Sequence, residues 1–327
     1  MLRHEYAEVN GVRLHYVTAG TGTLILFVHG FPEFWHAWRN QLTEFGRDYQ
    51  AVALDMRGYN LSSKPADVAQ YQVRVLVEDL RALREHLGHR KFVLVGHDWG
   101  GGVAWAYALL HPEDLERLII INAPHPAVFE RELRVNPAQQ QASQYMLMFR
   151  RPEAEQFLSA SNFAPLVEAV LAKGLKEGYF NEEDRKAYLE AWSQPGALTG
   201  GLNYYRAARI GPPTSESDSA WESFAREFSS RIVEVSTLVL WGEKDPYLLP
   251  GNLEGLEEFV PHVRWRLGGR PYAALVFAPD GFDAMVWADE SGAPEPLEAL
   301  RVVDGPVLAP SNRTLAYLKG GLGDAWR

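Results

Sequence analysis

One reactive side chain, the carboxylate of Asp98, lies within the most informative stretch of the chain. Residues 92–95 form a short apolar run that ends in Gly96-His-Asp-Trp-Gly100, and an apolar helical pattern begins at Val103. Strand, tight turn and helix in this order match the pattern G-x-nucleophile-x-G, which lifts one side chain out of a sheet. The N-terminus of the helix below favours an anion. We therefore interpret Asp98 as a nucleophile.

The glycines around Asp98 support this interpretation. Gly96 and Gly100 fit a turn that is too tight for Cβ atoms, and we expect Gly101 and Gly102 to let the helix pack close to the strand. A bare G-x-D-x-G sequence also describes an ordinary loop acid before a helix. The choice between the two depends on the rest of the chain.

The composition bounds the class of protein. The chain has 327 residues, of which 46% are hydrophobic, enough for one large α/β domain with an insertion or for two domains. It has no cysteine, which excludes disulfides, thiolate catalysis and cysteine metal sites. A formal net charge of -10 without a basic block argues against nucleic acid or an anionic membrane as partner. With no signal-peptide core and no bilayer-long apolar run, we expect a cytoplasmic protein.

Apolar runs alternate with helical patterns over the first part of the chain. Asn10-Gly11 predicts a hairpin turn between alternating segments within residues 6–17. We expect strands at 24–28, 51–54, 92–95 and 118–121, and helices at 40–47, 71–88 and after Asp98. This alternation favours an α/β fold with a mostly parallel, doubly wound sheet.

The pattern changes between residues 127 and 232. This region carries helical segments and no continuous β run, and it ends in a polar, proline-containing stretch. The expected helices lie at 137–149, 153–158, 163–171, 181–193 and 200–209. A strand returns at 235–241, followed by an expected helix at 253–259. We therefore predict a core made of residues 1–126 and 233–327, with 127–232 inserted as a helical cap.

Four of the expected strands end in distinctive sequences. They are His29-Gly-Phe-Pro32, Asp55-Met-Arg-Gly-Tyr59, Gly96-His-Asp-Trp-Gly100 and Gly242-Glu-Lys-Asp245. Ligands bind outside the carboxyl ends of strands in an open α/β sheet, so we expect all four to converge on one site. Their combination and order resemble the α/β-hydrolase superfamily, and most closely its epoxide hydrolases. The resemblance covers residues 1 to about 264.

The resemblance implies covalent catalysis by a carboxylate. Asp98 would attack an epoxide carbon and form an alkyl ester on the enzyme. Tyr145 and Tyr205 would protonate the leaving alkoxide, with Tyr204 as the alternate to Tyr205. A phenol suits this role because it is a far stronger acid than an alcohol.

The second step, hydrolysis of the ester, would use further residues that match the same family. The backbone N–H groups of Phe31 and Trp99 would stabilise the oxyanion. Asp245 would orient a histidine, and that histidine would activate water.

We expect an apolar pocket between core and cap. Its expected lining residues are Phe31, Pro32, Trp35, Trp99, Tyr145, Tyr204 and Tyr205. The expected partner is a small apolar substrate, and a homodimer stays open. No cofactor or metal is implied, since the sequence contains no HExxH, P-loop or G-x-G-x-x-G motif.

The pattern breaks where the family places its histidine, after one more strand beyond Asp245. The last histidine of the chain is His262, which stands before that strand. From about residue 265 onward the chain matches no part of the family pattern, although strands are expected at 272–277, 284–288 and 301–303. The tail, residues 265–327, is either divergent, frameshifted or fused. We assign no catalytic base and expect ester hydrolysis to be impaired.

Other functions and structural roles stay open. Haloalkane and haloacetate dehalogenases also use an aspartate elbow under a cap, but they need no tyrosine pair. A non-catalytic ligand-binding protein on the same fold would tolerate the missing histidine. The histidines near the motifs (His29, His97 and His125) are expected to be structural. Asp245 could serve only as a helix N-cap, and the two tyrosines as core aromatics.

Overall fold

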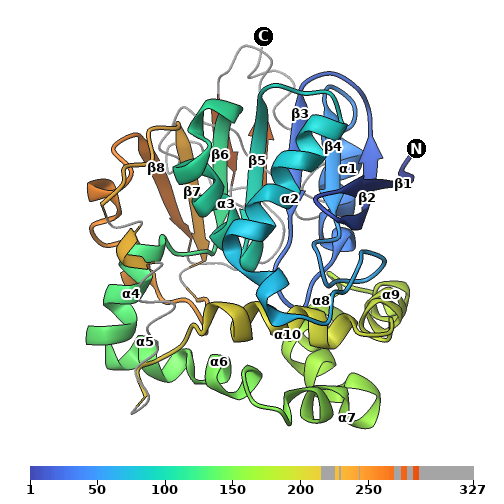
Figure 1. The fold of residues 1–327 in the computed structure, drawn as a ribbon, viewed down its shortest axis with the longest axis vertical. Coiled ribbons are helices and arrows are strands. Elements are labelled where there is room, and N and C mark those ends of the chain that lie inside the picture. Colours follow the sequence, from blue (N-terminus) through green and yellow to red (C-terminus); the bar gives the residue numbers. More distant parts are fainter. Residues whose placement is uncertain (215–224, 228–229, 243, 269–273, 278–282, 287–327) are drawn as a thin grey trace.

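A mostly parallel sheet forms the centre of the molecule (Figure 1). The computed structural model describes residues 1–214, 225–227, 230–242, 244–268, 274–277 and 283–286. The eight strands are ordered β1-β2-β4-β3-β5-β6-β7-β8. Their bounds are β1 Arg3–Val9, β2 Val12–Ala19, β3 Leu24–Val28, β4 Gln50–Leu54, β5 Phe92–His97, β6 Leu115–Ile121, β7 Thr237–Gly242 and β8 Val263–Gly268. Strands β4, β3, β5, β6, β7 and β8 are parallel to one another, whereas β2 is antiparallel to both β1 and β4.

The first two strands form the predicted hairpin. Its turn is made by Asn10 and Gly11, whose φ angles are 46° and 73°. Asparagine and glycine tolerate this left-handed region, and their turn matches the twist of the flanking strands.

Helices cover both faces of the sheet, as predicted. Side chains alternate along a strand, and in β3 the residues Ile25 and Phe27 belong to one core cluster while Leu24 and Leu26 belong to the other. Helix α1 (Arg39–Phe45) packs on the first face through Leu42. Helices α2 (Val73–His86) and α3 (Trp99–Leu110) pack on the other. The sheet is therefore doubly wound.

A helical cap is inserted between β6 and β7. It contains α4 Pro126–Val135, α5 Pro137–Ala142, α6 Gln144–Phe149, α7 Ala154–Leu166, a π-helical turn at Val167–Leu171, α8 Ala172–Glu177, α9 Glu182–Trp192 and α10 Ala197–Ala208. The described residues of this insertion include no strand. Figure 1 shows these helices gathered at one end of the sheet. None of the described helices is long and apolar enough to cross a membrane.

The region after β7 differs from the prediction in detail. The expected helix over residues 253–259 is replaced by two short 3-10 turns, Pro250–Leu253 and Leu256–Glu258. Gly255 lies between them with a φ of 71°, which interrupts a right-handed helix. Strands β9 (Ala274–Phe277) and β10 (Asp283–Val286) form a separate antiparallel pair. They overlap in sequence with the strands expected at 272–277 and 284–288. The expected strand at 301–303 lies outside the described residues.

Candidate active site

The turn between β5 and α3 holds Asp98 in an uncommon backbone conformation. Its φ is 51° and its ψ is -122°, a combination that costs energy for a residue with a Cβ atom. The neighbouring Gly100 leaves no room for a side chain, since a Cβ there would lie 2.2 Å from the carbonyl oxygen of Val28. The sequence thus folds into the strand–turn–helix arrangement that exposes one side chain at the apex.

Of the two glycines expected to bring the helix close to the strand, one does so. A Cβ on Gly101 would lie 3.2 Å from the carbonyl oxygen of Gly96 in β5, and 2.2 Å from the Cβ of Ala123 just after β6. The prediction was wrong for Gly102, which has nothing within 4 Å of an added Cβ. Gly102 instead borders a small pocket beside the turn.

Two backbone N–H groups point at the Asp98 carboxylate. The N–H of Phe31 donates to Oδ1 at 2.8 Å, and the N–H of Trp99 hydrogen-bonds to the same carboxylate. The close approach depends on Gly30, where a Cβ would lie 2.1 Å from Oδ1. The glycine of His29-Gly-Phe-Pro32 therefore lets this loop reach the carboxylate.

The surroundings of Asp98 shift its pKa in opposite directions. Burial raises the pKa of Asp98, and the negative charge of Asp245 raises it further. The charge of His97 and the N–H groups of Phe31 and Trp99 act in the other direction, but the net shift of the pKa is upward. The side chain is therefore a weaker acid than a free aspartic acid and a more basic carboxylate once ionised.

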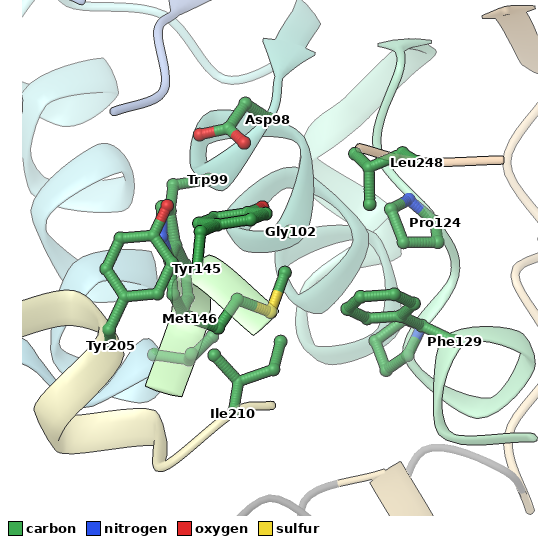
Figure 2. A pocket seen from close by; sticks show the side chains of 12 residues that line it. Asp98, Trp99, Gly102, Pro124, Phe129, Tyr145, Met146, Tyr205, Ile210 and Leu248 are labelled. Atoms are coloured by element: carbon green, nitrogen blue, oxygen red, sulfur yellow. The ribbon is translucent and has the colours of Figure 1, made fainter. Parts of the chain in front are cut away.

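Two tyrosines from the cap lie beside the carboxylate. Tyr145 belongs to α6 and Tyr205 to α10, and their rings meet edge to face with centroids 6.3 Å apart. In Figure 2 both rings lie below Asp98, and the hydroxyl of Tyr205 points toward it. Burial raises the pKa of both phenols well above the usual value, and the charge of Asp98 adds to the shift. Both are therefore protonated at neutral pH.

A cavity of about 460 Å³ connects these groups. Asp98, Tyr145, Tyr205 and Asp245 all border it. Its wall is otherwise largely apolar and includes Phe31, Pro32, Met148, Phe149, Phe157, Leu158, Pro165, Leu166, Ala169, Val170 and Leu248. A second, smaller pocket of about 50 Å³ shares Asp98 and both tyrosines and is bordered by Trp99 (Figure 2).

Asp245 follows β7 and its carboxylate is held from several sides. Oδ1 accepts the N–H groups of Tyr247 at 2.8 Å and Leu248 at 3.0 Å, so Asp245 does cap the turn that follows. Oδ2 accepts a 2.6 Å hydrogen bond from Nδ2 of Asn122. Sequence reasoning missed Asn122 as a site residue, although its position directly after β6 is a usable signal.

Trp35 and Tyr204, both predicted to line the substrate pocket, border neither pocket described above. The Trp35 ring packs edge to face on His4, with centroids 5.1 Å apart. Tyr204 is fully buried and donates its hydroxyl to the carbonyl oxygen of Arg57 at 2.7 Å. Consecutive residues of a helix point about 100° apart, so Tyr204 cannot share the direction of Tyr205.

All four loops were expected to converge on one site, but the loop after β4 borders neither pocket and supports the site from outside the cavity. Asp55 is fully buried, and its Oδ1 accepts the N–H of Trp35 at 2.9 Å. Its Oδ2 lies 2.6 Å from Nδ1 of His15 and accepts Nδ2 of Asn60 at 2.7 Å. The carboxylate thus fixes the loop that carries Phe31.

Glu33 and His97 are among the further polar residues that border the cavity. Sequence reasoning did not identify Glu33 as a site residue, although it directly follows the strand-end sequence His29-Gly-Phe-Pro32. Its carboxylate accepts the hydroxyl of Tyr188, and burial raises the pKa of Glu33. His97 also borders the cavity, close enough that a positive charge on its ring lowers the pKa of both Asp98 and Glu33.

His262 lies far from these groups. It directly precedes β8, whose first residue pairs with the first residue of β7, Thr237. Asp245 lies beyond the other end of β7. Six residues of strand span about 20 Å. His262 therefore lies at the amino ends of the strands, whereas Asp98 lies at their carboxyl ends. It is exposed and does not border the cavity.

Comparisons with known proteins agree with the fold. The α/β hydrolase fold family model matches residues 23–268. Epoxide hydrolase 4 of Mus musculus is 39% identical over 254 residues, covering 75% of this chain and 67% of that protein. An epoxide hydrolase of Bacillus megaterium, solved in complex with an inhibitor, is 40% identical with a TM-score of 0.73, covering 81% of this chain and 92% of that one.

A variant of the same Bacillus megaterium enzyme was solved with its product, a naphthyloxy-propane-1,2-diol. It is 39% identical, has a TM-score of 0.74, and the match covers 81% of this chain and 92% of that one. Family model, relatives and solved structures all agree. The chain belongs to the α/β hydrolase fold family and is an epoxide hydrolase-like enzyme.

Proposed function

We propose that this enzyme opens small apolar epoxides through a covalent ester on Asp98. The observation that carries the proposal is one cavity bordered by a buried carboxylate and by two protonated phenols, Tyr145 and Tyr205. This set supplies a nucleophile and two acids for one ring-opening step.

In the first step, a carboxylate oxygen of Asp98 attacks the less hindered epoxide carbon. A new C–O bond forms to the enzyme, and the C–O bond of the ring breaks. Tyr145 or Tyr205 transfers its proton to the alkoxide as it develops. The Phe31 N–H holds Oδ1, so we assign the attack to Oδ2.

In the second step, water attacks the carbonyl carbon of the Asp98 ester. The N–H groups of Phe31 and Trp99 would stabilise the oxyanion, and collapse would release the diol and restore the carboxylate. A base must take the proton from water. No histidine follows His262 in the chain, and His262 lies at the amino ends of the strands.

We therefore propose that ester hydrolysis is the impaired step. A general base contributes on the order of 10²–10⁴-fold to such a reaction. The family match ends at residue 268, the last residue of β8, so the tail that follows lies outside it. The chain as written would be alkylated rapidly and would release diol slowly.

The proposed core and cap would each provide part of the active site. Residues 1–126 and 233–327 act as the core, which provides Asp98 and Asp245. Residues 127–232 act as the cap, which provides Tyr145 and Tyr205. An aromatic and aliphatic wall suits an aryl-substituted epoxide, and the Bacillus megaterium relative carries a naphthyloxy diol as product.

Incubation with styrene oxide followed by peptide mapping tests the proposal. The expected result is an adduct of substrate mass on the peptide that contains Asp98, absent from Asp98→Ala. A parallel assay with 1-chlorobutane tests dehalogenation by the same nucleophile. Chloride release without any epoxide adduct or diol would replace the proposal with the dehalogenase function. No adduct, no diol and no chloride would favour a non-catalytic binder.

A further inference from the structure

Tyr204 connects the cap to the core at a point behind the active site. Its hydroxyl donates to the carbonyl oxygen of Arg57 at 2.7 Å, and its ring is fully buried. The ring also packs edge to face on Trp99, with centroids 5.6 Å apart. Trp99 in turn packs on Tyr205, at 5.1 Å. Tyr204 is thus bound to the core on one side of α10 while Tyr205 faces the cavity on another.

The backbone of α10 rests directly on the same core loop. A Cβ on Gly200 would lie 2.2 Å from the carbonyl oxygen of Gly58, so only glycine allows this approach. A Cβ on Gly58 would in turn lie 3.0 Å from Gly200, and the φ of Gly58 is 92°. The two glycines set the distance between α10 and the core, whereas the Tyr204 hydroxyl sets the rotation of the helix.

The loop that receives Tyr204 is itself fixed. The Arg57 guanidinium donates to Asp79 Oδ2 through Nε at 2.7 Å and to Oδ1 through Nη2 at 2.6 Å. Asp79 also accepts Nδ2 of Asn10 at 2.8 Å. A buried, bidentate ion pair of this kind holds its backbone in one geometry. The Arg57 carbonyl is therefore a fixed hydrogen-bond acceptor in the core for Tyr204 of α10.

From these contacts we infer that Tyr204 is a positioning residue for proton transfer by Tyr205; the inference rests on the proposed function. A tyrosine hydroxyl lies roughly 9 Å from its helix axis, so a rotation of α10 by about 10° moves the Tyr205 hydroxyl by roughly 1.5 Å. Displacements of that size cost up to about 10²-fold in a reaction step. Loss of the Tyr204 hydrogen bond slows epoxide opening without changing substrate binding.

The test uses Tyr204→Phe with two epoxides of similar size. Attack on the terminal carbon of 1,2-epoxybutane leaves a strongly basic alkoxide, which depends on its proton donor. The same attack on 1,1,1-trifluoro-2,3-epoxypropane leaves a weakly basic alkoxide, which depends on it much less. Single-turnover alkylation of Asp98, followed by intact-mass spectrometry, gives the rate constant and the half-saturating concentration for each. Tyr107→Phe is the matched control, because it removes one hydrogen bond of a buried tyrosine, to Asp114 at 2.9 Å, away from α10.

We expect Tyr204→Phe to slow alkylation by epoxybutane on the order of 10-fold, with a half-saturating concentration within about 2-fold of the original. Alkylation by the trifluoro epoxide slows by less than about 2-fold, and Tyr107→Phe leaves both rates unchanged. Gly200→Ala, which displaces α10 by another route, shows the same selective loss. Equal slowing with both epoxides means a general structural defect and overturns the inference, as does an unchanged Tyr204→Phe. If the original chain is alkylated by neither epoxide, the proposed function itself fails.

Discussion

The backbone N–H of Phe31 donates a 2.8 Å hydrogen bond to Oδ1 of Asp98, across 67 residues of sequence. This bond joins the loop after β3 to the turn after β5. It holds one oxygen of a carboxylate that borders the cavity. The same N–H would face the oxyanion when the ester is hydrolysed, so one contact would serve both chemical steps.

The two cap tyrosines are the first residues to test. We expect Tyr145→Phe and Tyr205→Phe each to slow alkylation of Asp98 by styrene oxide on the order of 10²-fold, because each removes one proton donor. The double variant should lose nearly all of the reaction. The measurement is single-turnover intact-mass spectrometry, with the exposed Tyr6→Phe as control. Full activity in the double variant would rule out the tyrosines as acids.

The pH dependence of alkylation follows from the pKa shifts. Asp98 must be ionised to attack, and its pKa is raised, so the rate should fall on the acid side at a pH above the ordinary aspartate value of about 3.9. The pKa of each tyrosine is also raised, so both donors stay protonated and the rate should stay flat up to about pH 10. A rate that declines between about pH 7 and 9 would contradict these assignments.

Asp245 should matter little for ester formation. Its charge contributes to the raised pKa of Asp98, so Asp245→Asn should move the acid limb of the alkylation profile to lower pH. The plateau rate at neutral pH should change by less than about 2-fold, since the hydrogen bonds of Asp245 go to Asn122, Tyr247 and Leu248 and its charge acts on Tyr145 only by raising the pKa of that phenol. A large loss of alkylation in Asp245→Asn would show that this carboxylate takes part in the first step.

Asp98 should reduce the stability of the fold. Its pKa is higher in the folded chain than in the unfolded chain, so stability falls as pH rises from the unfolded pKa through the folded one. At pH 7 this cost is fully present, and Asp98→Asn should remove it and raise the Tm. Each kcal/mol relieved is worth on the order of 2 °C in a domain of this size. Calorimetry should show the gain shrinking as the pH falls through the raised pKa of Asp98; a lower Tm at pH 7 would contradict the argument.

The core elements could be predicted because their apolar runs leave few alternatives. Side-chain direction could not, and this explains why Tyr204 and Trp35 were misassigned to the pocket. A helix offers two neighbouring tyrosines in different directions. The hydrogen bond of Tyr204 to the Arg57 carbonyl, formed only in the folded chain, leaves Tyr205 as the one that faces Asp98. The helix expected at 253–259 does not form, because the positive φ of Gly255 interrupts it although the apolar spacing is helical.

Glu33 and Asn122 were missed for a different reason. Glu33 and Asn122 carry no motif of their own, and their roles depend on partners distant in sequence. Asn122 meets Asp245, 123 residues further along, and Glu33 meets Tyr188, 155 residues further along. Such pairs become visible only when the strands and the cap are assembled.

The central claim is that the ester on Asp98 forms faster than it is hydrolysed. Its most direct test is a time course with excess styrene oxide, in which intact mass and released diol are measured in the same samples. We predict that the adduct approaches one equivalent per chain while diol accumulates on the order of 10²-fold more slowly than the adduct forms. Rapid diol release over many turnovers with no detectable adduct would contradict the claim. In that case a base within the cavity, with His97 as the first candidate, would be activating the water.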